Sequence, residues 1–284
     1  MNIVLISTCN MRGRTDLVER MLASVDRANA ALGGERIRLY LLVQECSAEE
    51  FANFRNNTSQ FVHLDQSPKR LSLSAARNRL MKHVLNHPLQ WERTVIGFPD
   101  DDAWYPAGTL EAVVSTFKAN KHLQFWFCRY ASSPVRWEQQ TIPKCRRPSL
   151  TEAIRRASSN TIFLRGDLAK TINVFDETLG VGTPNGSGED TDVAIRAFAL
   201  ASDVAYCDAP LIGHRDFVPA LRGKYYRGGL ITLARYVGVV DGIYFEFLRK
   251  LAVGAYLTLR REITAKNYLS AAHSAFTEIG RGTL

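Results

Sequence analysis

Two spacings of apolar residues alternate along the first hundred residues of the chain. Short apolar runs, which are typical of buried strands, are separated by segments in which apolar residues recur every three or four positions, as on one face of a helix. The apolar runs predict strands over residues 3–7, 37–43, 61–64 and 94–98. The helical spacing predicts helices over residues 16–32, 47–56 and 72–84. Strands that alternate with helices build a mostly parallel sheet flanked by helices, so we expect an α/β fold.

The pattern continues less regularly through the middle of the chain. It predicts helices over residues 110–117, 153–157 and 190–201, and strands over residues 123–127, 160–164 and 204–207. Residues 132–150 have no regular pattern, whereas residues 225–276 are helical, amphipathic and rich in aromatic side chains. At about 150 residues per domain, the chain has room for two folding units at most. We expect an α/β unit over residues 1–215 and a helical C-terminal extension over residues 216–284.

The basic charge of the chain is concentrated near its C-terminus. The 284 residues include 36 Lys or Arg and 28 Asp or Glu, which gives a net charge of +8. Residues 213–284 hold 11 of the basic and 5 of the acidic residues, so residues 1–212, with 25 and 23, are near neutral. No apolar run approaches the roughly 20 residues that span a bilayer, and the N-terminus lacks the basic region of a signal peptide. We therefore expect a cytoplasmic protein.

Three consecutive carboxylates, Asp100, Asp101 and Asp102, follow the predicted strand over residues 94–98. In open α/β sheets, ligands bind beyond the carboxyl ends of the strands. Mg²⁺ is commonly held by one or two carboxylates together with substrate phosphates. A solvated acidic turn is the alternative, since Asp is a common turn residue. The position at a strand end favours a metal site.

A second acidic pair, Glu189 and Asp190, stands at the start of a predicted helix. Four glycines precede it, at positions 180, 182, 186 and 188. Glycine lets a substrate approach the backbone closely, and a positioned carboxylate can act as a general base toward a hydroxyl group. The alternative is that acidic residues only stabilise the first helical turn, and we assign Asp192 to this role. His214 is a lone histidine after a short strand, which by itself indicates a structural hydrogen bond more often than a metal ligand.

Five motifs in this order resemble those of glycosyltransferase family 2, and the resemblance covers about residues 3–230. The motifs are Ser-Thr-Cys-Asn at 7–10, Leu-Ser-Ala-Ala-Arg-Asn at 73–78, Asp-Asp-Asp at 100–102, Gly-Glu-Asp at 188–190 and the single histidine at 214. The third is similar to the family's DxD motif and the fourth to its glycine loop with an ED motif. The resemblance implies a Rossmann-like GT-A fold and a glycosyltransferase of the hexosyltransferase type.

The same resemblance implies roles for individual residues. The residues implied in binding a nucleotide-sugar donor are Thr8, Asn10, Gln44, Arg77, Asp100 and Asp101, of which Asp100 faces the ribose. Asp102 and His214 would hold Mn²⁺ or Mg²⁺ against the diphosphate. Asp190 would deprotonate the acceptor hydroxyl, and Glu189 would help to position the acceptor. The family often has an Asp where this chain has Gln44, so a UDP-sugar is expected while dTDP and GDP donors stay open.

A base on the face of the sugar opposite the leaving diphosphate needs no covalent intermediate, which predicts inversion at the anomeric carbon. Relatives of this kind suggest a glycan or a lipid-linked acceptor in cell-surface polysaccharide synthesis. The basic amphipathic C-terminal region either lies against an anionic membrane surface, peripheral to the inner face of the plasma membrane, or packs on the catalytic unit. No nucleic-acid recognition motif accompanies its charge, so we expect no nucleic-acid partner.

Two other functions compete with this interpretation. A sugar-phosphate nucleotidyltransferase uses a similar sheet, but it normally carries a glycine-rich basic loop after the first strand. In this chain the corresponding residues 9–14 include a single glycine, Gly13. A non-catalytic domain that binds sugar nucleotides as a scaffold is the third candidate. The intact DxD, ED and histidine elements argue against a scaffold.

Overall fold

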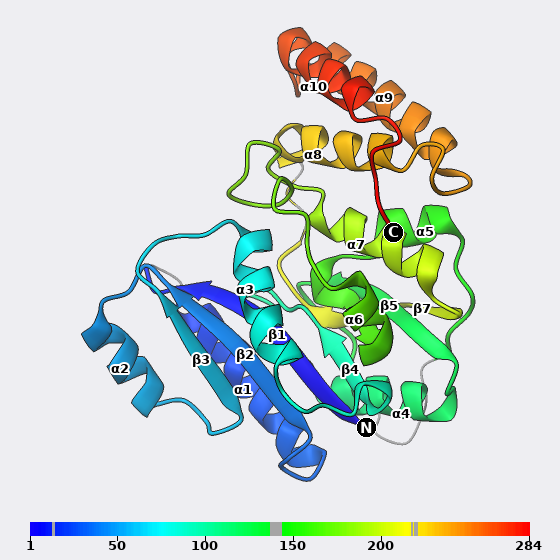
Figure 1. Ribbon diagram of the computed structural model, residues 1–284. Coiled ribbons are helices and arrows are strands. Elements are labelled where there is room, and N and C mark those ends of the chain that lie inside the picture. Colours follow the sequence, from blue (N-terminus) through cyan, green and yellow to red (C-terminus); the bar gives the residue numbers. More distant parts are fainter. Residues whose placement is uncertain (13–14, 137–143, 217, 219–220) are drawn as a thin grey trace.

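Seven strands form a single sheet in the order β3-β2-β1-β4-β6-β5-β7 (Figure 1). The computed structural model describes residues 1–12, 15–136, 144–216, 218 and 221–284. Parallel pairing joins β1 (Asn2–Asn10), β2 (Ile37–Gln44), β3 (Val62–Ser67) and β4 (Thr94–Gly97). β6 (Ile162–Arg165) is antiparallel to both of its neighbours, and β5 (Leu123–Ala131) is parallel to β7 (Asp203–Gly213). The predicted α/β class with a mostly parallel sheet is confirmed.

Helices cover both faces of this sheet. α1 (Thr15–Ala31) and α4 (Thr109–Ala119) pack on one face, and α3 (Leu73–Leu85), α6 (Gly166–Ile172) and α7 (Glu189–Leu200) pack on the other. Along β1, Ile3 and Leu5 contribute to the first core, whereas Val4 and Ile6 contribute to the second. A strand buried on both faces reads as a continuous apolar run, which is why the sequence shows this strand clearly.

The structure confirms one predicted helix start, adds a helix that was not predicted and begins another helix earlier than predicted. α2 (Ala48–Asn56) begins with the reciprocal capping box of Ser47 and Glu50 that the sequence suggests. α6 was not predicted, because its seven residues are too few to establish a helical period. α5 (Leu150–Arg156) begins three residues before the predicted start. Of the segment 132–150 that has no regular pattern, residues 137–143 lie outside the described part, as do residues 13–14 of the loop after β1.

Three helices form the C-terminal region, where the sequence shows one long amphipathic pattern. α8 (Arg222–Arg235), α9 (Ile243–Leu259) and α10 (Ala265–Thr277) bury a third apolar core, to which Ile195 of α7 and Leu179 also belong. Figure 1 shows the three helices together at one end of the molecule, next to α7 and far from α1 and α2. Among the described residues, no helix combines the length and the apolar character needed to cross a bilayer.

Candidate active site

The carboxyl ends of β4 and β7 bring Asp100, Asp102 and His214 together. Their ligand atoms all lie within 4.8 Å of one another. His214 Nε2 is 3.1 Å from Asp102 Oδ1 and 3.8 Å from Asp100 Oδ2. β7 runs six residues beyond its predicted end at Cys207, and this extension carries His214 to the carboxylates. The sequence-predicted pair of Asp102 and His214 is therefore adjacent, with Asp100 as a third member.

Backbone contacts between the two loops fix this group. Trp104 and Gly213 exchange two N–H···O=C hydrogen bonds of 2.9 and 2.8 Å. The Trp104 ring occupies the space beside Gly213, where a Cβ would lie 2.0 Å from the indole. The guanidinium of Arg20 on α1 lies over the Trp104 ring, with Cζ 3.7 Å from the ring centroid. It also donates a 3.1 Å hydrogen bond to the Asp102 carbonyl. These contacts explain why a glycine must precede His214.

The donor set suits a divalent cation. His214 Nδ1 lies 2.9 Å from the Arg215 carbonyl, and a hydrogen bond there leaves the lone pair of Nε2 directed at the carboxylates. Nε2 is buried and faces the Asp102 and Asp100 carboxylates. Burial lowers the pKa of His214, but the adjacent Asp102 and Asp100 carboxylates outweigh it and leave the pKa above its ordinary value. Two carboxylate oxygens and one imidazole nitrogen at this spacing fit Mn²⁺ or Mg²⁺.

Arg77 connects the two acidic centres from inside the protein. Its side chain on α3 is fully buried, and Nη2 donates 3.0 Å and 3.3 Å hydrogen bonds to Asp100 Oδ1 and to the Phe98 carbonyl. Nη1 lies 3.7 Å from Asp190 Oδ1. The other carboxylate oxygen of Asp100 accepts a 2.9 Å hydrogen bond from Asn160. The resemblance implied that Arg77 contacts the base and its surroundings and that Asp100 faces the ribose. In the structure Arg77 contacts the Asp100 and Asp190 carboxylates, and Asp100 lines the cavity.

Glu189 and Asp190 begin α7, directly after Gly188 in the left-handed conformation (φ 102°). The close approach of α8 requires this glycine, because a Cβ there would lie 2.4 Å from Thr232 Oγ1. Glu189 is 6% exposed, and burial together with the charge of Asp190 raises the pKa of Glu189 to about 8. Burial also raises the pKa of Asp190, on which Arg77 and Asp100 act in opposite directions. Burial therefore raises the pKa of both members of the acidic pair.

Asp192 is structural, as the sequence suggested. It forms an ion pair with Arg196 one turn along the helix and accepts a 2.6 Å hydrogen bond from the Tyr236 hydroxyl. All three side chains are buried. The residue ties α7 to α8 instead of facing the site.

The ends of β1 and β2 contribute a further set of polar side chains to the site. Gln44 donates a 3.1 Å hydrogen bond to Thr8 Oγ1 and accepts one of 2.7 Å from the Leu71 backbone N–H. Asn10 donates to Glu45, the residue after β2. The sequence pattern predicted Thr8, Asn10 and Gln44 from this edge, and the parallel register of Thr8 with Leu42 and of Asn10 with Gln44 brings them together.

One cavity of about 750 Å³ joins these groups. Of the predicted site residues, it is lined by Thr8, Asn10, Gln44, Asp100, Asp101, Asp102, Glu189, Asp190 and His214. The lining also includes residues that sequence reasoning did not assign to the site, among them Tyr130, Asn160, Lys224 and Lys250. Tyr130 and Asn160 belong to none of the five motifs, and the two lysines were grouped with the basic C-terminal region, so no local signal connected them with the cavity.

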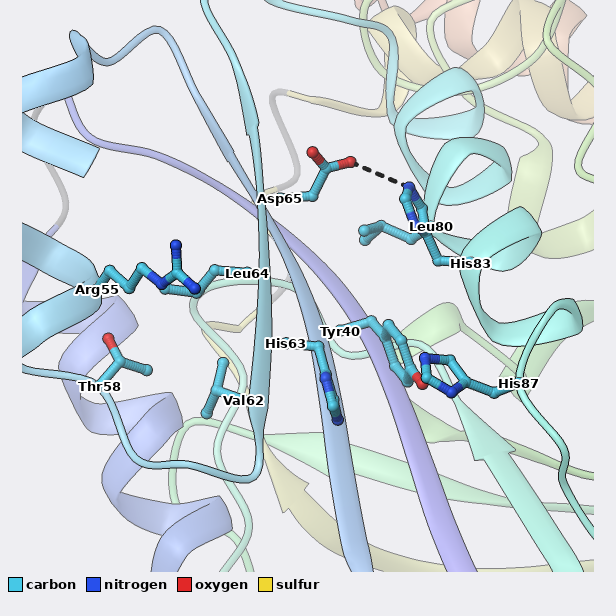
Figure 2. Close-up of a pocket in the computed structure, with 10 residues that line it drawn as sticks. All are labelled: Tyr40, Arg55, Thr58, Val62, His63, Leu64, Asp65, Leu80, His83 and His87. Carbon is cyan, nitrogen blue, oxygen red and sulfur yellow. Dashed lines mark ion pairs between the residues drawn. The ribbon is translucent and has the colours of Figure 1, made fainter. Parts of the chain in front are cut away.

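A second, smaller pocket of about 360 Å³ lies elsewhere, along the edge strand β3 (Figure 2). His63 stacks on Tyr40 with ring centroids 4.8 Å apart, and His87 approaches the same ring at 5.8 Å. His83 pairs with Asp65 at 3.4 Å. None of the predicted site residues lines this pocket.

The sequence of this chain was compared with protein-family models and curated proteins, and its fold with solved structures. The chain matches the model of Glycosyl transferase family 2 over residues 4–176, a stretch that ends before Glu189 and His214. No curated protein matches it in sequence.

Solved structures share the fold at low sequence identity. S. aureus TarS residues 1–349, in complex with UDP-GlcNAc, is 14% identical with a TM-score of 0.66, over 98% of this chain and 82% of that chain. The mannosyltransferase PcManGT from Pyrobaculum calidifontis, in complex with GDP-Man and Mn²⁺, is 15% identical with a TM-score of 0.57, over 100% of this chain and 76% of that chain. These similarities confirm the GT-A fold with its helical C-terminal region.

Proposed function

Because the chain belongs to glycosyl transferase family 2 and is a glycosyltransferase, we propose that it transfers a sugar from a nucleotide-diphosphate donor to a hydroxyl acceptor with inversion. One observation carries the proposal. A single cavity contains the Asp100–Asp102–His214 group, the Glu189–Asp190 pair and the polar ends of β1 and β2. Direct displacement of the diphosphate by the acceptor hydroxyl requires a metal-diphosphate site and a general base in the same cavity.

The donor is a nucleotide sugar bound over β1 and β2, and we expect a UDP-sugar. Thr8 and Asn10 of β1 and Asp101 of the loop after β4 line the cavity and supply polar groups for the nucleotide. The similarity to TarS in complex with UDP-GlcNAc and to PcManGT in complex with GDP-Man supports a nucleotide sugar of this general kind.

Asp102 and His214 would hold a cation, Mn²⁺ or Mg²⁺, with Asp100 beside them. Such an ion would stabilise the negative charge that grows on the leaving diphosphate. Arg77 is a positioning residue, since it holds Asp100 and Asp190 in place without lining the cavity. Mn²⁺ in the PcManGT complex supports a divalent cation for this fold.

Asp190 is the general base. The acceptor oxygen forms a bond to the anomeric carbon while the bond from that carbon to the diphosphate oxygen breaks. The electron pair leaves with the nucleoside diphosphate, and the acceptor proton passes to the Asp190 carboxylate. Its raised pKa makes Asp190 a stronger base. Glu189, which keeps its proton at neutral pH, donates a hydrogen bond that positions the acceptor.

Donor turnover tests this mechanism. A panel of nucleotide sugars is incubated with and without Mn²⁺, and the released nucleotide is identified. We expect metal-dependent release of a nucleoside diphosphate; release of pyrophosphate would establish a nucleotidyltransferase instead, and background turnover with every donor would favour a scaffold.

Two variants separate the roles, with Asp241→Asn on the exposed turn before α9 as the matched control. Asp190→Asn should bind donor and lose transfer, whereas Asp102→Asn should lose the response to Mn²⁺. Unaltered transfer by Asp190→Asn would refute the assignment of the base.

The helical C-terminal extension over residues 216–284 is proposed to place the enzyme on the inner, cytoplasmic face of an anionic membrane while it packs on the α/β unit over residues 1–215. Its acceptor is then a lipid-linked or glycan substrate of cell-surface polysaccharide synthesis. Tyr244, Phe245 and Leu259 of α9 are 53%, 74% and 83% exposed, and Arg260 and Arg261 follow them. Anionic liposomes should pellet the protein at low salt and less so at high salt. Absence of pelleting at low salt would favour a purely structural role for these helices.

A further inference from the structure

The C-terminal helices supply one wall of the active-site cavity. Leu221, Lys224, Tyr225 and Gly229 line it from α8 and the residue before it, and Lys250 lines it from α9. Two of these five residues are cations. The wall lies in the same cavity as Glu189 and Asp190, which the sequence analysis did not connect with the basic region.

Close backbone packing fixes this wall against the loop that carries the base. Ser187 donates a 2.8 Å hydrogen bond to the Tyr225 carbonyl. A Cβ at Gly228 would lie 2.1 Å from the Ser187 carbonyl oxygen, so α8 rests directly on the glycine loop. Thr232 donates a 3.3 Å hydrogen bond to the carbonyl of Gly188, the residue before the acidic pair. α8 therefore packs directly on the loop that leads into Glu189 and Asp190.

Lys250 is held in a position that disfavours an isolated charge. A Cβ at Gly229 would lie 3.2 Å from its Nζ, and Nζ is 5.8 Å from the centroid of the Tyr226 ring. Burial lowers the pKa of Lys250, and the charge of Arg249 lowers it further. The glycine at 229 gives the lysine room to reach the cavity.

Neither Lys250 nor Lys224 lies within ion-pair distance of a carboxylate in the described part of the chain. Two arginines of the same helices differ, since Arg235 pairs with Asp176 and Glu278 and Arg249 pairs with Glu246. Lys224 is exposed, whereas Lys250 is partly buried, and a partly buried cation is costly unless it is paired. A negatively charged ligand would offset that cost.

We propose that Lys250, assisted by Lys224, binds an anionic group of the acceptor, so that the acceptor is a hydroxyl compound that carries a phosphate or a carboxylate close to the reacting oxygen. This inference rests on the proposed function, because it assumes that the acceptor enters beside Asp190. The diphosphate of the donor is assigned to the Asp100–Asp102–His214 group of the same cavity. Lys250 is thus a specificity-determining residue for the acceptor.

The test uses small acceptor probes after the donor panel has identified the nucleotide. The protein is first saturated with Mn²⁺ and that nucleoside diphosphate, which fills the donor site. Glycerol 3-phosphate, glycerate and glycerol are then titrated calorimetrically, to represent a phosphate, a carboxylate and a neutral acceptor. The variants are Lys250→Met and, as a matched control, Lys266→Met on the exposed surface of α10.

We expect one or both charged probes to bind at least about tenfold more tightly than glycerol, since a hydrogen bond to a charged group is worth about 1.5–3 kcal/mol and about 1.4 kcal/mol is tenfold. Lys250→Met should abolish this preference and Lys266→Met should retain it. Equal binding of all three probes, or a preference that survives Lys250→Met, would overturn the inference while leaving the proposed function intact. A weaker affinity of Lys250→Met for the nucleoside diphosphate, with the probe preference unchanged, would assign the lysine to the donor and overturn it as well. If no nucleotide sugar is turned over, the proposed function fails first.

Discussion

The buried carboxyl group of Glu189 should make the stability of the protein fall as the pH rises. Its pKa is raised from 4.5 to about 8 because the side chain is buried beside Asp190. In the unfolded chain the group ionises near its ordinary value, so unfolding releases a proton between these two pKa values. The stabilisation is therefore fully present below pH 4.5 and is lost as the pH rises through about 8.

The size of the effect follows from the same two values. Each pH unit between them is worth about 1.4 kcal/mol, so the full interval corresponds to about 5 kcal/mol. Between pH 5.5 and pH 8.5, where a buffer series is practical, the loss integrates to about 3 kcal/mol. Glu189→Gln keeps the shape of the side chain and does not titrate, so the variant should not show this loss.

The assay is urea denaturation of both proteins at pH 5.5, 7 and 8.5. The free energy of unfolding of Glu189→Gln, relative to the unsubstituted protein, should rise by about 3 kcal/mol across the series. Glu35→Gln, at an exposed position before β2, serves as the control and should show no such rise. A difference that stays constant with pH would refute the argument that burial keeps Glu189 protonated.

Three further predictions concern the metal group and the packing of α8. His214→Gln should weaken Mn²⁺ binding by at least about tenfold, because even changes to residues that support a metal ligand cost about 10- to 100-fold in affinity. Calorimetric titration measures the affinity, and an unchanged value would remove His214 from the ligand set. Tyr236→Phe should lower the free energy of unfolding by about 2 kcal/mol, because Asp192 loses a 2.6 Å charge-assisted hydrogen bond in a buried position; a urea titration that shows no loss would contradict this. Gly228→Ala should cost about 3 kcal/mol by overpacking and also lower kcat, since its Cβ would press on the Ser187 carbonyl; wild-type kcat in a folded variant would argue against the coupling of α8 to the base.

The sequence alone determined the local elements and the types of chemistry. The buried strands β1 and β2 are visible as apolar runs because both of their faces are covered. Short-range signals such as the Ser47–Glu50 capping box act within one turn of chain and can be read directly. The acidic groups at 100–102 and 189–190 were identified because both are contiguous and follow a strand or a glycine loop. Sequence motifs can identify groups of this kind because their residues are adjacent along the chain.

Only the tertiary structure decided how these groups meet. Arg77 was assigned to the nucleotide from its motif, but burial on α3 places its guanidinium between Asp100 and Asp190, which lie 90 positions apart. The sequence showed the basic C-terminal region as a separate tail, whereas packing of α8 on the glycine loop brings Lys250 into the cavity. Such contacts depend on which side chains fill the same space after folding. That choice is made by long-range packing and by the need to pair buried charges, neither of which leaves a periodic mark along the chain.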